Sequence, residues 1–251
     1  MKLIKALLVA TVTFSISTSL SASTPLYDKG LHAYQNKHYK SAEKLWKRSA
    51  RRGDIAAMYS LALLYEQGKA GKPDLQEAEK WYKEAATNGA PQAQYNLGRL
   101  YYDQKNYDQA AHWFKVAAKA DQPQAQFELA TLYEDGLGVE KSAKDAVAWY
   151  TKAGENGNAP AQLKLVLMYM QGKGVEKDDI KAFTWAKAAA KSGEPNGKYL
   201  LGYMYYEGKG TIKNKDMAIV WLEDAMKSGQ PRAKHLIEMI EKDSSEAVSA
   251  R

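Results

Sequence analysis

The tryptophans of this 251-residue chain recur at a fixed interval, and that interval constrains the fold more than any other feature. Five of the six lie eight residues before the end of a repeating unit, and the units are 36 residues long except for one of 32. A period of this length is typical of helical repeat proteins, in which each unit buries its apolar face against its neighbours. The chain is therefore expected to be an all-α solenoid. The five residues are Trp81, Trp113, Trp149, Trp185 and Trp221.

Each unit is predicted to contain two antiparallel helices. In the first helix, a small residue, usually alanine, is followed four positions later by a leucine and after four more by a tyrosine. This spacing places all three on one buried helical face. The leucines are Leu61, Leu97, Leu129, Leu165 and Leu201, and the tyrosines are Tyr65, Tyr101, Tyr133, Tyr169 and Tyr205.

A turn follows each tyrosine, and glycine in this turn is expected to end the first helix. The second helix then has a favoured N-cap residue, whose side-chain oxygen can accept a free backbone N–H. These residues are Asp74, Asn106, Ser142, Asp178 and Asn214. Glu77, Gln109 and Asp145, three positions further on, would permit a reciprocal capping box.

The two ends of the chain differ from the repeats. Lys2 and Lys5 precede an apolar run and a short stretch of small polar residues, which predicts a secretory signal peptide over residues 1–22, with cleavage after Ala22 or Ser23. Residues 24–242 are expected to form a single solenoid of about six hairpins with a C-terminal capping helix, and 243–251 a flexible tail. Because the chain has no cysteine, it is not expected to be a lipoprotein, and the predicted location is the periplasm or the cell exterior.

The pattern Ala-x-x-x-Leu-Gly-x-x-Tyr-x-x-Gly-x-Gly, followed by an Asp/Asn cap and Ala-x-x-Trp, resembles the Sel1-like repeat family, most clearly in 125–157 and 197–229. The 32-residue unit 90–121 lacks the two-glycine turn and resembles the related tetratricopeptide repeat, and residues 26–53 look similar. The resemblance implies a right-handed α-α superhelix. It also implies protein–protein interaction rather than catalysis, because exported bacterial members act as adaptors, regulators, immunity proteins or virulence factors.

Charge gives a weaker indication of the partner. Without the signal peptide the chain has 34 basic and 29 acidic residues, a mildly basic balance that could favour anionic partners such as cell-wall polymers, lipid head groups or an acidic protein. Lysines spaced along helices from glutamates are more typical of solvated faces. We identified no arginine cluster and no nucleic-acid motif, so nucleic acid is not an expected partner. No segment after the signal peptide is predicted to span a membrane.

Enzymatic interpretations of the sequence are less favoured than protein binding. Ser41 and Lys44 have the Ser-x-x-Lys spacing of penicillin-recognising enzymes, and Lys-Ser-Gly occurs at 191–193 and 227–229, but the Ser-Asp-Asn motif is missing. The four histidines are scattered and have no metal-binding spacing. We therefore expect no enzyme activity, cofactor or metal, with weak β-lactamase-like or cell-wall hydrolase activity and glycan binding as the alternatives.

A protein partner, bound as an extended peptide or a helix, is expected in the concave groove formed by the first helices, which line the inner wall of such a solenoid. Positions two before, two after and five after each repeat leucine would face this groove and would form a wall rich in tyrosine, a residue enriched in binding hot spots. The aromatic residues two positions before the leucine, such as Tyr59, are equally expected to pack between units. The stronger candidates for binding are Arg99, Tyr102, Tyr203 and Tyr206. The predicted groove residues are Tyr59, Tyr95, Arg99, Tyr102, Phe127, Glu134, Tyr199, Tyr203 and Tyr206.

Overall fold

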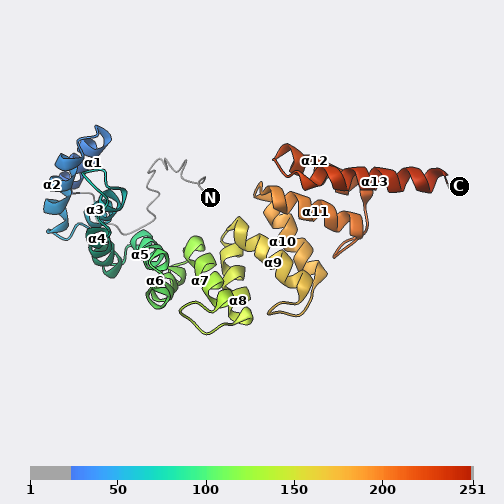
Figure 1. Cartoon of the computed structure of the whole chain (residues 1–251), viewed down its shortest axis with the longest axis horizontal. Coiled ribbons are helices and arrows are strands. Elements are labelled where there is room, and N and C mark those ends of the chain that lie inside the picture. Colours follow the sequence, from blue (N-terminus) through green and yellow to red (C-terminus); the bar gives the residue numbers. More distant parts are fainter. Residues whose placement is uncertain (1–23, 250–251) are drawn as a thin grey trace. The chain divides into compact units, whose positions relative to one another are not determined.

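The computed structural model describes residues 24–249, with side chains as far as Asp243, and this part of the chain is helical without a β-strand. The all-α prediction is therefore confirmed (Figure 1). The predicted signal peptide lies outside the described residues. The helices are α1 (Pro25–Gln35), α2 (Tyr39–Ala50), α3 (Ile55–Gln67), α4 (Leu75–Thr87), α5 (Pro91–Asp103), α6 (Tyr107–Lys119), α7 (Pro123–Asp135), α8 (Ala143–Glu155), α9 (Ala159–Gln171), α10 (Asp179–Lys191), α11 (Pro195–Glu207), α12 (Lys215–Lys227) and α13 (Arg232–Ser249).

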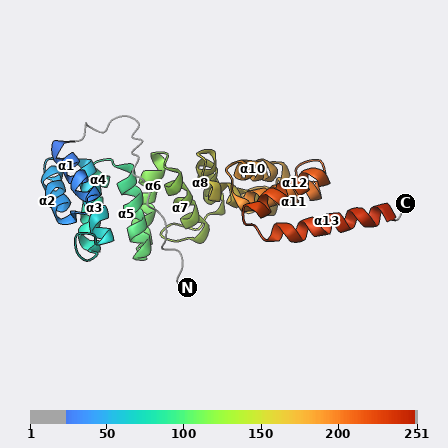
Figure 2. The same ribbon diagram turned by 90° about the horizontal axis from the view of Figure 1, so that it is seen from above.

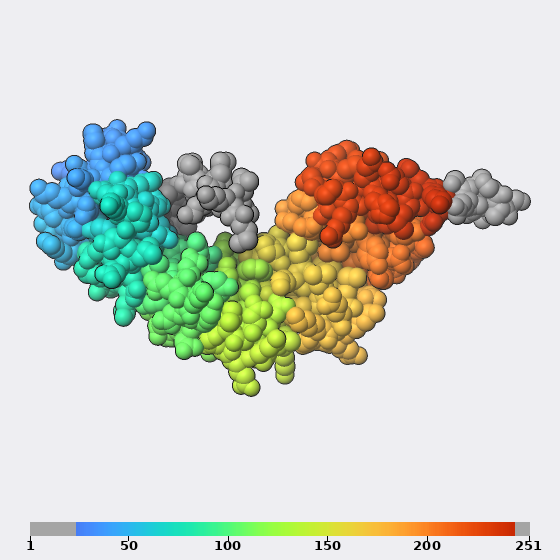
Figure 3. Space-filling model, in the orientation of Figure 1, coloured from blue at the N-terminus to red at the C-terminus, as the bar shows by residue number. Residues whose placement is uncertain are grey.

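The helices form two compact units, which divide between Glu84 and Ala85. In the first unit, α2 packs against both α1 and α3. In the second unit the hairpins α5–α6, α7–α8, α9–α10 and α11–α12 follow one another, and each second helix packs against the next first helix. Their surfaces abut from green through orange in Figure 3. The stacked hairpins confirm the repeat architecture within this unit, while the continuity of one solenoid over 24–242 stays a prediction.

The repeat leucines form the centre of each hairpin, as predicted. Leu61, Leu97, Leu129 and Leu165 are fully buried, and burial of each such side chain contributes about 1.5–3 kcal/mol. The five repeat tryptophans, in contrast, are only partly buried. In three hairpins the ring that fills the core belongs to the next residue, namely Tyr82, Phe114 or Tyr150.

The predicted N-caps of the second helices are also confirmed. Ser142 Oγ, for example, accepts the backbone N–H of Asp145 at 3.1 Å, and the other four cap residues do the same for the residue three positions on. The prediction of a capping box is wrong, because each cap's own backbone N–H already donates to the carbonyl of the repeat tyrosine. That bond measures 2.9 Å from Ser142 to Tyr133.

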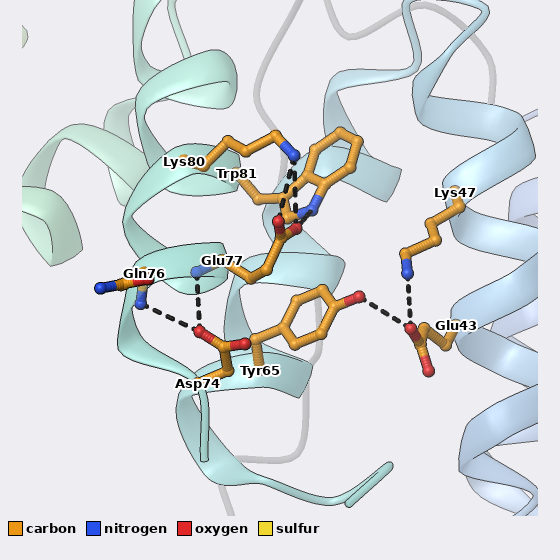
Figure 4. Close-up of polar contacts among 8 residues, drawn as sticks. All are labelled: Glu43, Lys47, Tyr65, Asp74, Gln76, Glu77, Lys80 and Trp81. Atoms are coloured by element: carbon orange, nitrogen blue, oxygen red, sulfur yellow. Dashed lines mark hydrogen bonds and ion pairs between the residues drawn. The ribbon is translucent and has the colours of Figure 1, made fainter. Parts of the chain in front are cut away.

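Figure 4 shows the capping geometry at the start of α4. Asp74 accepts the backbone N–H groups of Gln76 and Glu77. The Glu77 carboxylate does not reach back to the cap, and instead accepts from Trp81 Nε1 at 3.0 Å and from Lys80 Nζ at 3.1 Å. One of the repeat tryptophans is thereby held by a side chain of its own helix.

The second glycine has a role beyond ending a helix in three of the two-glycine turns, those that follow α7, α9 and α11. Gly174, between α9 and α10, has a φ of +76°, and a Cβ placed on it would lie 2.3 Å from the backbone oxygen of Ala143 at the start of α8. Gly138 and Gly210 approach the first residues of α6 and α10 in the same way. Only glycine combines this conformation with such a close approach. Each of these loops therefore packs against the preceding hairpin.

Buried glutamines link consecutive second helices in the second unit. Gln126, on α7, donates Nε2–H to the carbonyl of Ala118 near the end of α6 at 3.1 Å, and its Oε1 accepts from Asn156 Nδ2 just after α8 at 3.0 Å. Gln162 makes the corresponding pair of bonds one hairpin later. We call these pairs of bonds the glutamine bridges, because each satisfies a buried amide and ties together two helix ends.

The glutamine bridge at Gln94 is incomplete. Its Nε2–H donates to the Ala86 carbonyl at 3.1 Å, but its Oε1 is buried without a hydrogen-bond partner. The residues that donate in the next two hairpins, Asn156 and Ser192, follow the ends of α8 and α10. The corresponding residue after α6 is Ala120, whose side chain has no donor.

The last helix extends beyond the predicted boundary of the array. α13 packs on α11 and α12 and continues past Lys242 to Ser249 (Figure 2). No glycine or proline occurs between Lys242 and the C-terminus, so the sequence contains no strong helix-ending signal there. The helix therefore does not end at residue 242, after which the flexible tail was predicted to begin.

Candidate functional site

Eight of the nine predicted groove residues lie in the second unit, on the first helices α5, α7 and α11. Tyr59 lies on α3, in the first unit. The aromatic residues two positions before the repeat leucine pack against the core ring of their own hairpin: the ring centroids are 5.9 Å apart for Tyr95 and Phe114 and 5.5 Å apart for Phe127 and Tyr150. Tyr59 and Tyr82 are related in the same way in the first unit.

Glu134, on α7, is held by three donors. Lys164 Nζ and Tyr150 OH donate to Oε2 at 2.9 and 2.8 Å, and Lys173 Nζ donates to Oε1 at 2.6 Å. Burial by itself would raise the pKa of this carboxyl group, but these hydrogen bonds outweigh burial and lower the pKa to about 2. Both oxygens are therefore occupied, and the carboxylate stabilises the contact between α7 and α9 instead of offering itself to a partner.

Tyr206 is not part of an open wall. Its side chain is only 8% exposed and belongs to the core formed by α11, α12 and α13. Its hydroxyl donates to the Asp243 carboxylate, and this bond, together with burial, raises the pKa of Tyr206. Because the helix was predicted to end before Asp243, the sequence analysis left Tyr206 open to solvent, and we withdraw it from the candidate site.

The remaining tyrosine candidates are all half-buried and differ in the groups that contact their rings. Tyr203 is half-buried, and Lys209 Nζ donates to its hydroxyl at 2.9 Å while lying 4.9 Å from the ring centroid. Tyr199 is also half-buried and packs against the core at α12 and α13. Tyr102 is half-buried, and its ring meets Tyr107 edge-on at 5.4 Å.

The polar centre of the candidate site is formed by α5 and α7. Arg99 is exposed, and Glu128 is half-buried; neither side chain makes a hydrogen bond or ion pair with any described residue. Burial raises the pKa of Glu128, while the nearby Arg99 cation opposes the rise and Asp103 adds to it. Sequence analysis missed Glu128, although a charged residue directly before a fully buried leucine was a signal that could have indicated it.

The alternative enzymatic residues are not assembled into a site. Ser41 and Lys44 are both exposed on α2, and their side chains are not hydrogen-bonded to each other. In the two Lys-Ser-Gly motifs the serines act in the repeat structure: Ser192 donates to Gln162, and Ser228 accepts from Lys198. Within residues 24–243, no group of three or more His, Asp or Glu side chains is arranged to hold a metal ion.

Comparison with family models decides the family. Sel1 repeats match residues 26–54, 55–89, 123–158, 159–194 and 195–229, which together exceed half of the chain. This chain is a Sel1 repeat protein. A tetratricopeptide repeat matches residues 87–125, which confirms the interpretation of the 32-residue unit, whereas residues 26–54 are a Sel1 repeat and not the tetratricopeptide-like unit that their sequence suggested.

Solved structures include relatives of this Sel1 repeat protein. A protective antigen of uropathogenic Escherichia coli with the same repeat fold is 30% identical and superposes with a TM-score of 0.82 over 87% of this chain; the chain spans about half (49%) of that antigen. A Sel1 repeat protein from Oxalobacter formigenes is 29% identical, with a TM-score of 0.78, over 86% of this chain and 90% of the other. A search of curated proteins finds no match.

Proposed function

We propose that this Sel1 repeat protein is an exported, non-catalytic scaffold that binds another protein of the bacterial envelope through the first-helix face of its second unit. Its role would be that of an adaptor, regulator or inhibitor. The similarity to a protective antigen supports export, since such an antigen has to be reached by the immune system.

The observation that carries the proposal is a mixed surface whose groups are not used by the fold. Arg99 is exposed and Glu128 is half-buried, and neither makes a hydrogen bond or close ion pair with a described residue, although their charges attract each other; Tyr102 lies on the same helix as Arg99. Leu167, at the position on α9 that Arg99 occupies on α5, is 44% exposed. Arginine and tyrosine are enriched among the residues that contribute most at protein interfaces, and an exposed leucine supplies apolar area beside them.

Crosslinking and affinity capture from the native envelope fraction test the proposal. The bait would be the chain without residues 1–23, compared with an Arg99→Glu, Tyr102→Ala, Leu167→Asp variant and with a control, Lys115→Glu, Lys144→Glu, altered on exposed second-helix positions. We expect one protein to be captured by the parent and by the control and to be lost with the first variant.

Two outcomes would contradict the proposal. A protein retained equally by all three baits would be bound elsewhere on the molecule. Capture of purified peptidoglycan stripped of protein, with no protein partner, would instead favour the glycan-binding alternative. Circular dichroism of all three baits establishes that each is folded.

A further inference from the structure

The excess positive charge of the described chain is concentrated in one helix and its two flanks. Residues 37–52 contain seven basic residues and one acidic residue, an excess of six positive charges. The rest of residues 24–249 contains 26 basic and 28 acidic residues. Outside this segment the described chain is therefore slightly acidic, and its mildly basic overall balance conceals a local cluster. The cluster includes the three arginines Arg48, Arg51 and Arg52, so the expectation that the chain has no arginine cluster is wrong.

The cluster forms a continuous row on the solvent face of α2. At 3.6 residues per turn, Lys40, Lys44, Arg48 and Arg51 fall within about 80° of arc and span about 16 Å along the axis. All four are exposed, while Ala42 and Trp46 on the opposite face are buried. We call these four residues the basic stripe; Lys37 and Arg52 extend it at its two ends.

The protein neutralises the stripe only weakly, through the charge of Glu43 near Lys40. The only acidic residue of the segment, Glu43, accepts from Lys47 Nζ at 2.7 Å and from Tyr65 OH at 2.7 Å, as Figure 4 shows. No side chain of the stripe makes an ion pair or hydrogen bond with a described residue. Lysines and arginines spaced three or four residues apart repel one another along a helix. The fold therefore gains nothing from this arrangement beyond the favourable position of its last cations at the helix C-terminus.

We propose that the basic stripe binds the anionic lipid surface of a bilayer, with the lipid phosphates as its ligands. Protein interfaces are depleted of lysine and have an apolar centre, but no large apolar side chain is strongly exposed on α2 or its flanks. A row of exposed cations without an apolar anchor recognises charge density rather than shape, as polybasic segments on anionic membranes do. The inference rests on the envelope location in the proposed function, but it concerns a different surface from the protein-binding face.

Co-sedimentation with vesicles tests the inference. The chain without residues 1–23 would be mixed with vesicles of phosphatidylcholine alone or containing about 30% phosphatidylglycerol. We expect binding only to the anionic vesicles and release at high salt. The variant Lys40→Gln, Lys44→Gln, Arg48→Gln, Arg51→Gln should bind on the order of a thousandfold more weakly, at about 1 kcal/mol for each cation removed. Because the substitutions are exposed and remove mutual repulsion, this variant should unfold no more easily than the parent.

A control of equal charge separates the stripe from net charge. Lys115→Gln, Lys119→Gln, Lys144→Gln and Lys187→Gln remove four exposed cations that lie on α6, α8 and α10. This control should bind nearly as well as the parent. The inference is overturned if the control loses as much binding as the stripe variant, if the parent does not distinguish the two vesicles, or if it binds a duplex oligonucleotide or polyglutamate more tightly at equal salt. These readouts use no envelope protein, so failure here is distinct from failure of the proposed function.

Discussion

At the scale of single residues, the incomplete glutamine bridge is a defect that one substitution can repair. Gln94 Oε1 is buried without a partner because Ala120 stands where the next two hairpins have a donor. Ala120→Asn, which introduces the side chain that Asn156 has at the corresponding position, should supply the missing hydrogen bond. We expect the free energy of unfolding to increase by about 0.5–1.5 kcal/mol, measured by urea denaturation.

A double-mutant cycle distinguishes this bond from a general effect of asparagine after a helix. In a Gln94→Met background the acceptor is gone, so Ala120→Asn should no longer stabilise the protein. An equal gain in both backgrounds would show that the new side chain acts locally at the end of α6.

The lowered pKa of Glu134 predicts that the free energy of unfolding depends on pH. The pKa of Glu134 in the folded chain is lowered to about 2, so its contribution to stability is fully present above the unfolded value near 4.5 and is lost as the pH falls through the folded value. Glu134→Gln should therefore be less stable than the parent at pH 7, and the difference should shrink between about pH 5 and pH 2. Lys164 and Lys173 are 40% and 47% exposed, so solvent screening will moderate the effect.

Urea unfolding of the two proteins at several pH values measures this difference. Glu155→Gln serves as the control, because Glu155 is exposed and its side chain makes no hydrogen bond or ion pair with a described residue. A gap between parent and Glu134→Gln that stays constant over the whole pH range would contradict the prediction.

At the scale of elements, glycine substitutions in the loops test how neighbouring hairpins are joined. Gly172 and Gly174 both have a left-handed conformation, with φ of +71° and +76°, but only Gly174 approaches the backbone of the preceding hairpin. Gly172→Ala should cost about 1–2 kcal/mol for the conformation alone. Gly174→Ala should cost a further 1–3 kcal/mol, roughly, because the added Cβ collides with Ala143. Thermal or urea unfolding of both variants checks the difference, and equal losses would show that the close approach is relieved without cost.

The elements also show where prediction from sequence succeeds and fails. Periodicity and cap chemistry are local, so the helices, the buried leucines and N-caps such as Ser142 were predictable. The occupied carboxylate of Glu134 and the burial of Tyr206 depend on side chains 30 to 39 positions away, which one sequence does not bring together. The basic stripe was within reach of the sequence, but averaging charge over the chain concealed it.

At the scale of the whole molecule, export is the prediction that remains to be tested. Among residues 24–249, no helix is both long and apolar enough to cross a membrane. Expression of the full chain in a bacterium should yield a protein in the envelope or medium whose N-terminus is Ser23 or Thr24, as determined by N-terminal sequencing. Recovery of the chain from the cytoplasm with residues 1–22 intact would contradict both the export and the envelope role.

The contact of each two-glycine loop with the preceding hairpin has a consequence for how such chains evolve. This contact is made by a glycine of one repeat and mainly the backbone of the preceding one, so it depends less on the identity of side chains than the glutamine bridges do. A repeat can then be duplicated, deleted or exchanged while the contact is kept, and the residues on its exposed face are free to diversify. A family built in this way can vary in length by whole repeats, and an antigen about twice as long as this chain is a natural member of it.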